Sequence, residues 1–107
     1  MLKLPPQPDA CELCLRPVAK LTRHHLIPRH LHRKKRFQRL FSKEDLITRT
    51  LWVCRPCHNA IHRAGSEYEL GLHYNTREKL LELDELRTFV QWLRDKPEGF
   101  VPKHRRG

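Results

Sequence analysis

The chain has few acidic and few apolar residues for its length. Aspartate and glutamate number 12 against 22 lysines and arginines, and the formal net charge at pH 7 is +10. A surface this cationic fits a polyanionic partner, of which nucleic acid is the commonest, although it can also serve solubility alone. Only 38% of the 107 residues are hydrophobic. We therefore expect one small domain with a thin core that a bound metal would help to stabilise.

Long apolar runs are also missing. No segment approaches the roughly eighteen apolar residues that a membrane span needs, and 1–6 lack the apolar stretch of a signal peptide. We therefore expect a soluble, cytoplasmic protein without a membrane partner. In a reducing compartment cysteines serve as metal ligands more often than as disulfides.

The four cysteines form two Cys-x-x-Cys pairs, Cys11 with Cys14 and Cys54 with Cys57. Each pair can direct two thiolates at one ion, and two pairs complete a closed tetrahedron around Zn²⁺. Redox or iron–sulfur use is the alternative. A thioredoxin-like site, however, needs only one pair, within a βαβ pattern that this sequence lacks. The spacing predicts a structural zinc site that adds stability to the fold.

Histidines recur beside the cysteines. His24 and His25 are adjacent, whereas His58 and His62 lie four apart and would share one face of a helix. Neighbouring side chains on a strand point to opposite sides. His24 and His25 could therefore belong to the same site only if the strand twists or bulges there, or if the site lies at its edge. Either pair alone could consist of ordinary core or surface histidines. Together with the cysteines they indicate a second site, in which neutral imidazoles act as ligands or as a base.

Local patterns outline an α+β fold. An extended leader is expected over 1–10, where three prolines occur. Strands are expected within 18–26 and 48–53, and Pro56 suits the first turn of a helix that breaks near Gly65.

The remaining segments are expected to be helical or irregular. Residues 29–39 are cation-rich and predict an exposed loop or short helix, and 42–45 could begin another helical turn. From Thr76 to Pro97 an apolar stripe predicts one helix, or two broken near Asp84, packed over the metal core. The stripe consists of Leu80, Leu83, Leu86, Val90 and Leu93, widened by Leu81, Phe89 and Trp92.

Basic and aromatic residues give candidates for nucleic-acid contact. The run Arg33, Lys34, Lys35 and Arg36 could neutralise phosphates without reading sequence, as could the tail 99–107. A solvated charged face is the alternative. Trp52 and Trp92 are interpreted as core residues rather than base-stacking ones, because apolar neighbours flank each.

Residues 11–63 resemble the zinc-ribbon branch of the HNH endonucleases. Cys-x-x-Cys, His-His-Leu-Ile-Pro and Leu-Trp-Val-Cys-Arg-Pro-Cys-His-Asn-Ala-Ile-His follow one another in the order and spacing of that family. The resemblance implies a ββα-metal (His-Me finger) module, two strands and a helix around one catalytic ion. This module would span 11–65, with a helical extension over 66–98 packed on it and the basic tail after it.

The resemblance also implies roles for individual residues. His24 and His58 would bind a catalytic divalent ion (Mg²⁺, Mn²⁺, Ni²⁺ or Zn²⁺), and His25 would be the general base. His62 would be a third ligand or contact a phosphate. Asn59 could assist at the metal.

One position departs from the family pattern. Family members often carry an asparagine nine residues before the first helical histidine, where it braces the loop that holds the base. Arg49 stands there in this chain. Thr48 or Thr50 could brace that loop through a hydroxyl.

The implied function is metal-dependent hydrolysis of DNA with little sequence preference. A monomer or weak dimer with one active site would nick a single strand. A catalytically silent, zinc-stabilised nucleic-acid-binding module is the alternative, which the departure at Arg49 keeps open. A colicin-like toxin domain is a weaker third reading, since no segment resembles a translocation domain. The host would be a prokaryote or a phage.

Overall fold

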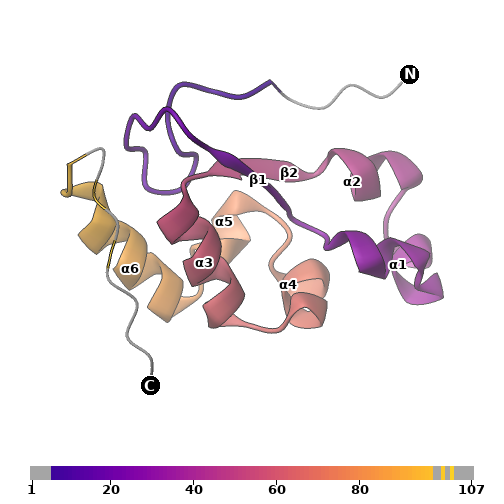
Figure 1. Cartoon of the computed structure of the whole chain (residues 1–107). Helices are drawn as coiled ribbons and strands as arrows, with labels where there is room; N and C mark the ends of the chain where they lie inside the picture. Colours follow the sequence, from indigo (N-terminus) through magenta and orange to yellow (C-terminus); the bar gives the residue numbers. More distant parts are fainter. Residues whose placement is uncertain (1–5, 98–99, 101, 103–107) are drawn as a thin grey trace.

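The structure is a computed structural model that describes residues 6–97, 100 and 102, and it confirms the predicted α+β class. A two-stranded antiparallel sheet lies between two groups of helices (Figure 1). Strand β1 (Thr22–His25) pairs with β2 (Thr50–Val53), and His25 stands opposite Thr50. Both strands are shorter than the ranges expected from the sequence. The second begins late because Thr48 still belongs to a helix.

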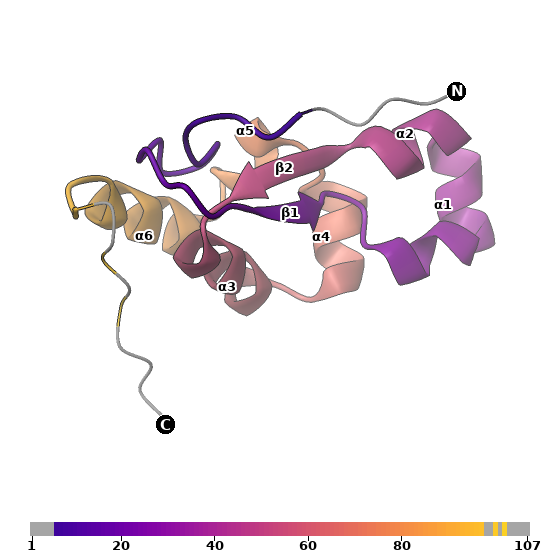
Figure 2. The same ribbon diagram turned by 45° about the horizontal axis from the view of Figure 1, so that its top comes forward.

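Helix α3 (Arg55–Ala64) follows β2 directly, with Pro56 in its first turn as predicted. Its capping residue at the carboxyl end is Gly65. Helix α6 (Asp84–Arg94) packs against α3, so that the two lie side by side at one end of the molecule (Figures 1 and 2). The shared core buries apolar residues of both helices, including Ala60, Ile61, Leu86, Val90 and Leu93.

The chain between the strands forms the opposite end of the molecule (Figure 2). It contains a short 3-10 helix, η1 (Arg29–Arg33), followed by α1 (Lys35–Leu40) and α2 (Lys43–Thr48). The Ser42 hydroxyl caps α2 by accepting a hydrogen bond from the Asp45 amide. A second small core lies beneath these helices and consists of Ile27, Leu31, Phe37 and Leu46. The lysines and arginines of 29–43 are exposed, and so is the apolar side chain of Leu40, at 54%.

Helices α4 (Glu67–His73) and α5 (Arg77–Leu80) join the two ends. The predicted stripe after Thr76 does form two helices, since α5 ends before Asp84 begins α6. Helix α4 was not predicted. It lies very close to η1. A Cβ added at Gly71 would be only 2.9 Å from Cδ of Pro28. Only glycine fits this approach without a shift of its neighbours.

The two tryptophans differ in burial. Trp52 is partly buried against the main core, as predicted. The prediction that Trp92 is a core residue is wrong, because 44% of its surface is exposed. Two residues after Val90, it lies on a different side of α6 from the buried stripe. Its ring contacts those of Phe89 and Phe100, and the Lys96 ammonium lies 4.8 Å from its centre.

The ends of the chain are described only in part. Residues 6–10 of the leader contain no helix, and Ala10 forms a bridge with Pro17. Residues 1–5 and most of the predicted basic tail, 99–107, lie outside the described residues. Within the described part of the chain, no helix has the length and apolar character needed to span a membrane.

Candidate metal centres

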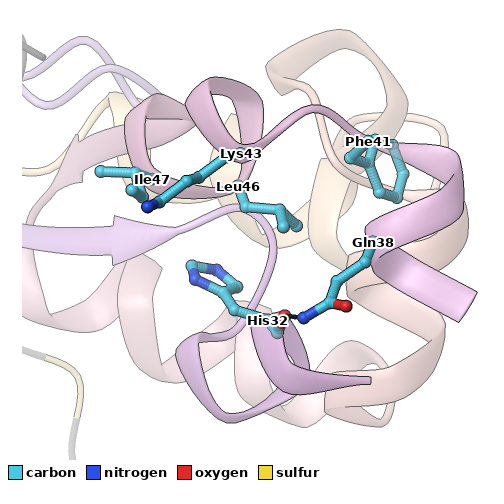
Figure 3. Close-up of a pocket in the computed structure, with 6 residues that line it drawn as sticks. All are labelled: His32, Gln38, Phe41, Lys43, Leu46 and Ile47. Carbon is cyan, nitrogen blue, oxygen red and sulfur yellow. Dashed lines mark hydrogen bonds between the residues drawn. The ribbon is translucent and has the colours of Figure 1, made fainter. Parts of the chain in front are cut away.

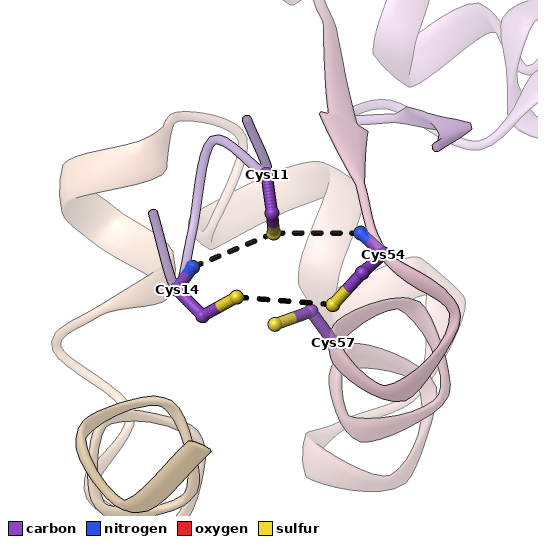
Figure 4. Close-up of side chains that lie close together, drawn as sticks. All are labelled: Cys11, Cys14, Cys54 and Cys57. Atoms are coloured by element: carbon purple, nitrogen blue, oxygen red, sulfur yellow. Dashed lines mark hydrogen bonds between the residues drawn. The ribbon is translucent and has the colours of Figure 1, made fainter. Parts of the chain in front are cut away.

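The four cysteines meet at one point between the leader and the start of α3, as the spacing predicted. All four are buried, and their sulfur atoms lie within 4.8 Å of one another (Figure 4). Cys11 and Cys14 come from a tight turn that is closed by a hydrogen bond from the Leu15 amide to the Cys11 carbonyl. Leu15 has a left-handed backbone, with φ of 67°, a conformation that costs a non-glycine residue about 1–2 kcal/mol. Cys54 and Cys57 come from the end of β2 and the first turn of α3.

The surroundings of the sulfur atoms fit a cation. The backbone amides of Leu13, Cys14 and Cys54 each point at Cys11 Sγ from 3.4 Å, as donors to a thiolate do. The four thiols also shift one another's pKa values in opposite directions. Hydrogen bonds from Cys11 and then Cys54 lower the pKa of Cys14, whereas hydrogen bonding with Cys11 and Cys14 raises the pKa of Cys57. A bound Zn²⁺ would allow all four to be thiolates.

Arg16 is a buried cation beside this cluster, with only 4% of its surface exposed. Its guanidinium lies 3.5 Å from Cys14 Sγ and 3.6 Å from Cys54 Sγ, and it donates to the Pro97 carbonyl at 2.7 Å. A buried cation needs an opposite charge nearby, and the thiolates supply one. Sequence reasoning missed Arg16 because nothing but its position after the first cysteine pair distinguishes it from 21 other basic residues.

Three histidines form a second cluster. His24 from β1 and His58 and His62 from α3 offer ring nitrogens within 4.8 Å of one another. Their ring centres are 5.0 to 5.5 Å apart. His24 is almost fully buried, and its Nε2 has no hydrogen-bond partner among the described residues. An unpaired buried nitrogen is costly, so the cluster fits a metal ion that would accept this lone pair.

A hydrogen bond to Thr22 determines which nitrogen of His58 is available. The Thr22 hydroxyl donates to the Val53 carbonyl at 3.1 Å and lies 2.8 Å from Nδ1 of His58. When the hydroxyl donates its hydrogen to the Val53 carbonyl, it accepts a hydrogen bond from a protonated Nδ1, and Nε2 of His58 is then the nitrogen available as a ligand. No sequence pattern indicated this role for Thr22.

Lowered pKa values favour the neutral form of His24, His25 and His58. Burial, and then the proximity of His58, lower the pKa of His24 to about 3. Burial also lowers the pKa of His58 to about 4, with a further contribution from His62. The pKa of His25 is lowered by burial and by Arg23. Neutral imidazole is the form that binds metal or accepts a proton.

His25 lies beside this cluster but outside its set of three. It follows His24 on β1, so its side chain leaves the strand on the other side. Because it is the last residue of β1, it still lines the same hollow, which has a volume of about 380 Å³. This histidine hollow is lined by Arg23, His24, His25, Pro28, Arg29, His30, His58, His62 and Glu67.

The segment after His25 is braced by backbone atoms. The Arg49 carbonyl accepts a hydrogen bond from the Leu26 amide at 3.0 Å, which any residue at position 49 could do. The Arg49 side chain turns away to Asn75, whose Oδ1 lies 3.0 Å from it. The hydroxyls suggested for bracing do not provide it: that of Thr48 bonds within α2, and that of Thr50 is buried without a partner among the described residues.

The other predicted residues lie around these centres. Asn59 is half-buried on α3 and does not belong to the histidine cluster. Arg33, Lys34, Lys35 and Arg36 are exposed where η1 ends and α1 begins. A separate cavity of about 500 Å³ opens between η1, α1 and α2 (Figure 3). Its lining residues are His32, Gln38, Phe41, Lys43, Leu46 and Ile47.

The chain is similar to a curated bacterial protein. No protein-family model matches the chain. No solved structure matches it significantly. The chain is 33% identical over 87 residues to the uncharacterized protein YisB of Bacillus subtilis (strain 168), and the match covers 81% of this chain and 75% of YisB. The chain therefore belongs to the same family as YisB.

Proposed function

We propose that this protein is a metal-dependent endonuclease of the HNH type that nicks DNA by hydrolysing one phosphodiester bond. The observation that carries the proposal is the convergence of His24, His58 and His62 beside His25 in one hollow. The order β1, β2, α3, with candidate ligands on β1 and α3, supports a ββα-metal module. The four-cysteine cluster would hold the start of α3 and thereby position His58.

The three clustered histidines would hold the catalytic ion. Bound there, a divalent ion would supply positive charge to the scissile phosphate and to the departing oxygen. An all-imidazole set favours Mn²⁺, Ni²⁺ or Zn²⁺ over Mg²⁺. Three ligands leave coordination positions open for substrate and water.

His25 would act as the general base. Its pKa is lowered, so the ring is neutral near pH 7 and can accept a proton from an attacking water. It lines the hollow from the end of β1, next to but outside the ligand set. This separates the group that moves a proton from the groups that bind metal.

DNA is the substrate that fits the charge of the chain. The net charge is +10, and four cations, Arg33 to Arg36, are exposed on the side of the molecule that carries η1 and α1. Such contacts attract phosphates without reading bases. A nucleic-acid-binding module without catalysis is the second candidate, because Arg49 replaces the asparagine typical of HNH enzymes.

A plasmid-relaxation assay separates the two. Supercoiled plasmid is incubated with wild type, His25→Ala and His58→Ala in Mn²⁺, Ni²⁺ or Mg²⁺, and DNA binding is followed by fluorescence anisotropy. The control is His73→Ala, which removes an exposed histidine at the end of α4, outside the histidine hollow.

Wild type and the control should convert plasmid to open circles. His25→Ala should be slower by about 10² to 10⁴-fold with binding unchanged. Binding by wild type without cutting in any ion would favour the silent module. Absence of both binding and cutting would reject both functions.

A further inference from the structure

A second hollow adjoins the histidine hollow along η1. It has a volume of about 590 Å³ and is lined by Arg29, His30, His32 and Arg33. Two of these residues, Arg29 and His30, also line the histidine hollow. The two hollows therefore lie next to each other.

The second hollow is suited to an anion. All four lining residues are basic types, and Arg29 and Arg33 are exposed. Neither arginine forms an ion pair with a residue that the structure describes. The acidic residue nearby, Glu67, lines the histidine hollow instead and is engaged by His30 Nδ1 at 3.0 Å. Two uncommitted guanidinium groups on one short helix suit the oxygens of a phosphate.

The backbone that carries these arginines is fixed. Leu31 is buried in the second core. Nε2 of His32 donates to the Ile27 carbonyl at 2.8 Å, and the Gln38 amide donates to the His32 carbonyl at 3.1 Å. Because residue 71 is a glycine, α4 can pack closely against η1. Fixed positions lower the entropy cost of binding a ligand.

The neighbouring features are less suited to a phosphate. The cavity beyond His32 has apolar walls from Phe41, Leu46 and Ile47, and Lys43 is the single lysine or arginine that lines it (Figure 3). Lys35 and Arg36 belong to α1 and line neither the histidine hollow nor the η1 hollow. Their contribution to DNA binding would therefore lie outside both hollows.

We propose that the η1 hollow is a phosphate subsite, in which Arg29 and Arg33 bind a backbone phosphate of the cut strand close to the scissile one. The inference rests on the proposed nuclease function and deepens it. It assigns to two particular arginines the task of fixing which bond of the strand enters the histidine hollow.

The test uses a DNA duplex in which a single phosphate is replaced by an uncharged methylphosphonate. A nuclease with little sequence preference nicks all linkages except the neutral one, which leaves a first gap in the nick pattern at that position. If a second phosphate must be bound during cutting, a further gap appears in the nick pattern at a fixed distance from the neutral linkage. Nick patterns are compared for wild type, Arg29→Ala/Arg33→Ala and the charge-matched control Lys35→Ala/Arg36→Ala.

Wild type should show the second gap, with nicking there reduced about tenfold to a hundredfold, the range for a lost charge-assisted hydrogen bond. The arginine pair variant should nick more slowly everywhere and lose the gap. Lys35→Ala/Arg36→Ala should keep the second gap, although its affinity for DNA decreases. A gap of equal depth in wild type and Arg29→Ala/Arg33→Ala, or no gap in wild type, would overturn the subsite.

A binding measurement keeps the test independent of catalysis. Short single strands with all phosphates charged or with one neutral phosphate are titrated into His25→Ala protein, with and without the Arg29 and Arg33 changes. A position-dependent loss of affinity that requires both arginines supports the subsite even when nothing is cut. Equal affinity for all strands in both backgrounds rejects it, whatever the plasmid assay shows.

Discussion

The hydroxyl of Thr22 lies 2.8 Å from Nδ1 of His58, and its own hydrogen is donated to the Val53 carbonyl. This arrangement favours the His58 tautomer that is protonated on Nδ1, so a β-strand residue orients a candidate metal ligand. In that tautomer, Nε2 carries the lone pair that can bind a metal ion.

Thr22→Val should weaken metal binding at the histidine cluster about 10 to 100-fold, the usual effect of losing a group that orients a ligand. Isothermal titration with Mn²⁺ or Ni²⁺ measures the affinity, and ¹⁵N chemical shifts of His58 report the protonated nitrogen. Thr22→Ser keeps the hydroxyl and should retain both. Equal affinity in the valine and serine variants would show that the hydrogen bond has no such role.

Arg16→Ala should make the cysteine cluster release zinc more readily. The change removes the guanidinium that faces Cys14 Sγ and Cys54 Sγ, so the charge of the thiolates would be less well compensated. We expect transfer of zinc to a colorimetric chelator to be about tenfold faster. The control is Arg94→Ala, because among the described residues Arg94 donates to the Cys14 carbonyl, at 3.4 Å, and to no cysteine sulfur. Unchanged release in Arg16→Ala, or equal acceleration in the control, would contradict this role.

Burial of neutral His24 should make the fold sensitive to acid. Its pKa is lowered to about 3 in the folded protein from 6.5, so between these values the unfolded chain binds more protons. The contribution of His24 to the free energy of unfolding is fully present above pH 6.5 and decreases as the pH falls. Between pH 7.5 and 5.0 the loss should be about 2 kcal/mol.

Urea unfolding of wild type and His24→Leu at both pH values, without added divalent ions, measures this contribution. Effects of the cysteines and of His58 occur in both proteins and cancel in the comparison. The wild type should lose about 2 kcal/mol more than the variant. The same loss in both proteins would mean that His24 is not buried in its neutral form.

Asn75→Ala should destabilise the protein by about 1–3 kcal/mol, because it removes a buried amide with satisfied hydrogen bonds. Asn75 donates to the Gly71 carbonyl at 3.0 Å and accepts from Arg49 at 3.0 Å. Chemical denaturation measures the effect. Thr48→Ala, which removes one bond within α2, should change stability much less. If the two variants are equally stable, Asn75 does not hold α4 and α2 together.

The sequence predicted what depends on local spacing. Cys54 and Cys57 are three residues apart and Pro56 marks a first helical turn, so the sulfur pair and the start of α3 could both be anticipated. The apolar stripe with Leu86, Val90 and Leu93 similarly identified the buried face of α6. These features repeat at the period of the structure that they form.

Features that depend on contacts between distant segments could not be predicted. Arg16 contacts Cys54 and Pro97, which are far from it along the chain. Helix α4 depends on the close approach of Gly71 to Pro28, and neither residue signals the other in sequence. Trp92 has apolar neighbours in sequence, yet it lies on an exposed side of α6 because Val90 and Leu93 determine which face is buried.

The proposed function requires two separate metal sites, one formed by the four sulfur atoms and one by the three imidazoles. Crystals grown with zinc and soaked in Mn²⁺ allow anomalous difference maps at the zinc and manganese edges. We predict a zinc peak among Cys11, Cys14, Cys54 and Cys57 and a separate manganese peak bonded to His24, His58 and His62. A zinc peak alone, with no ion at the three histidines even at saturating Mn²⁺, would contradict the claim.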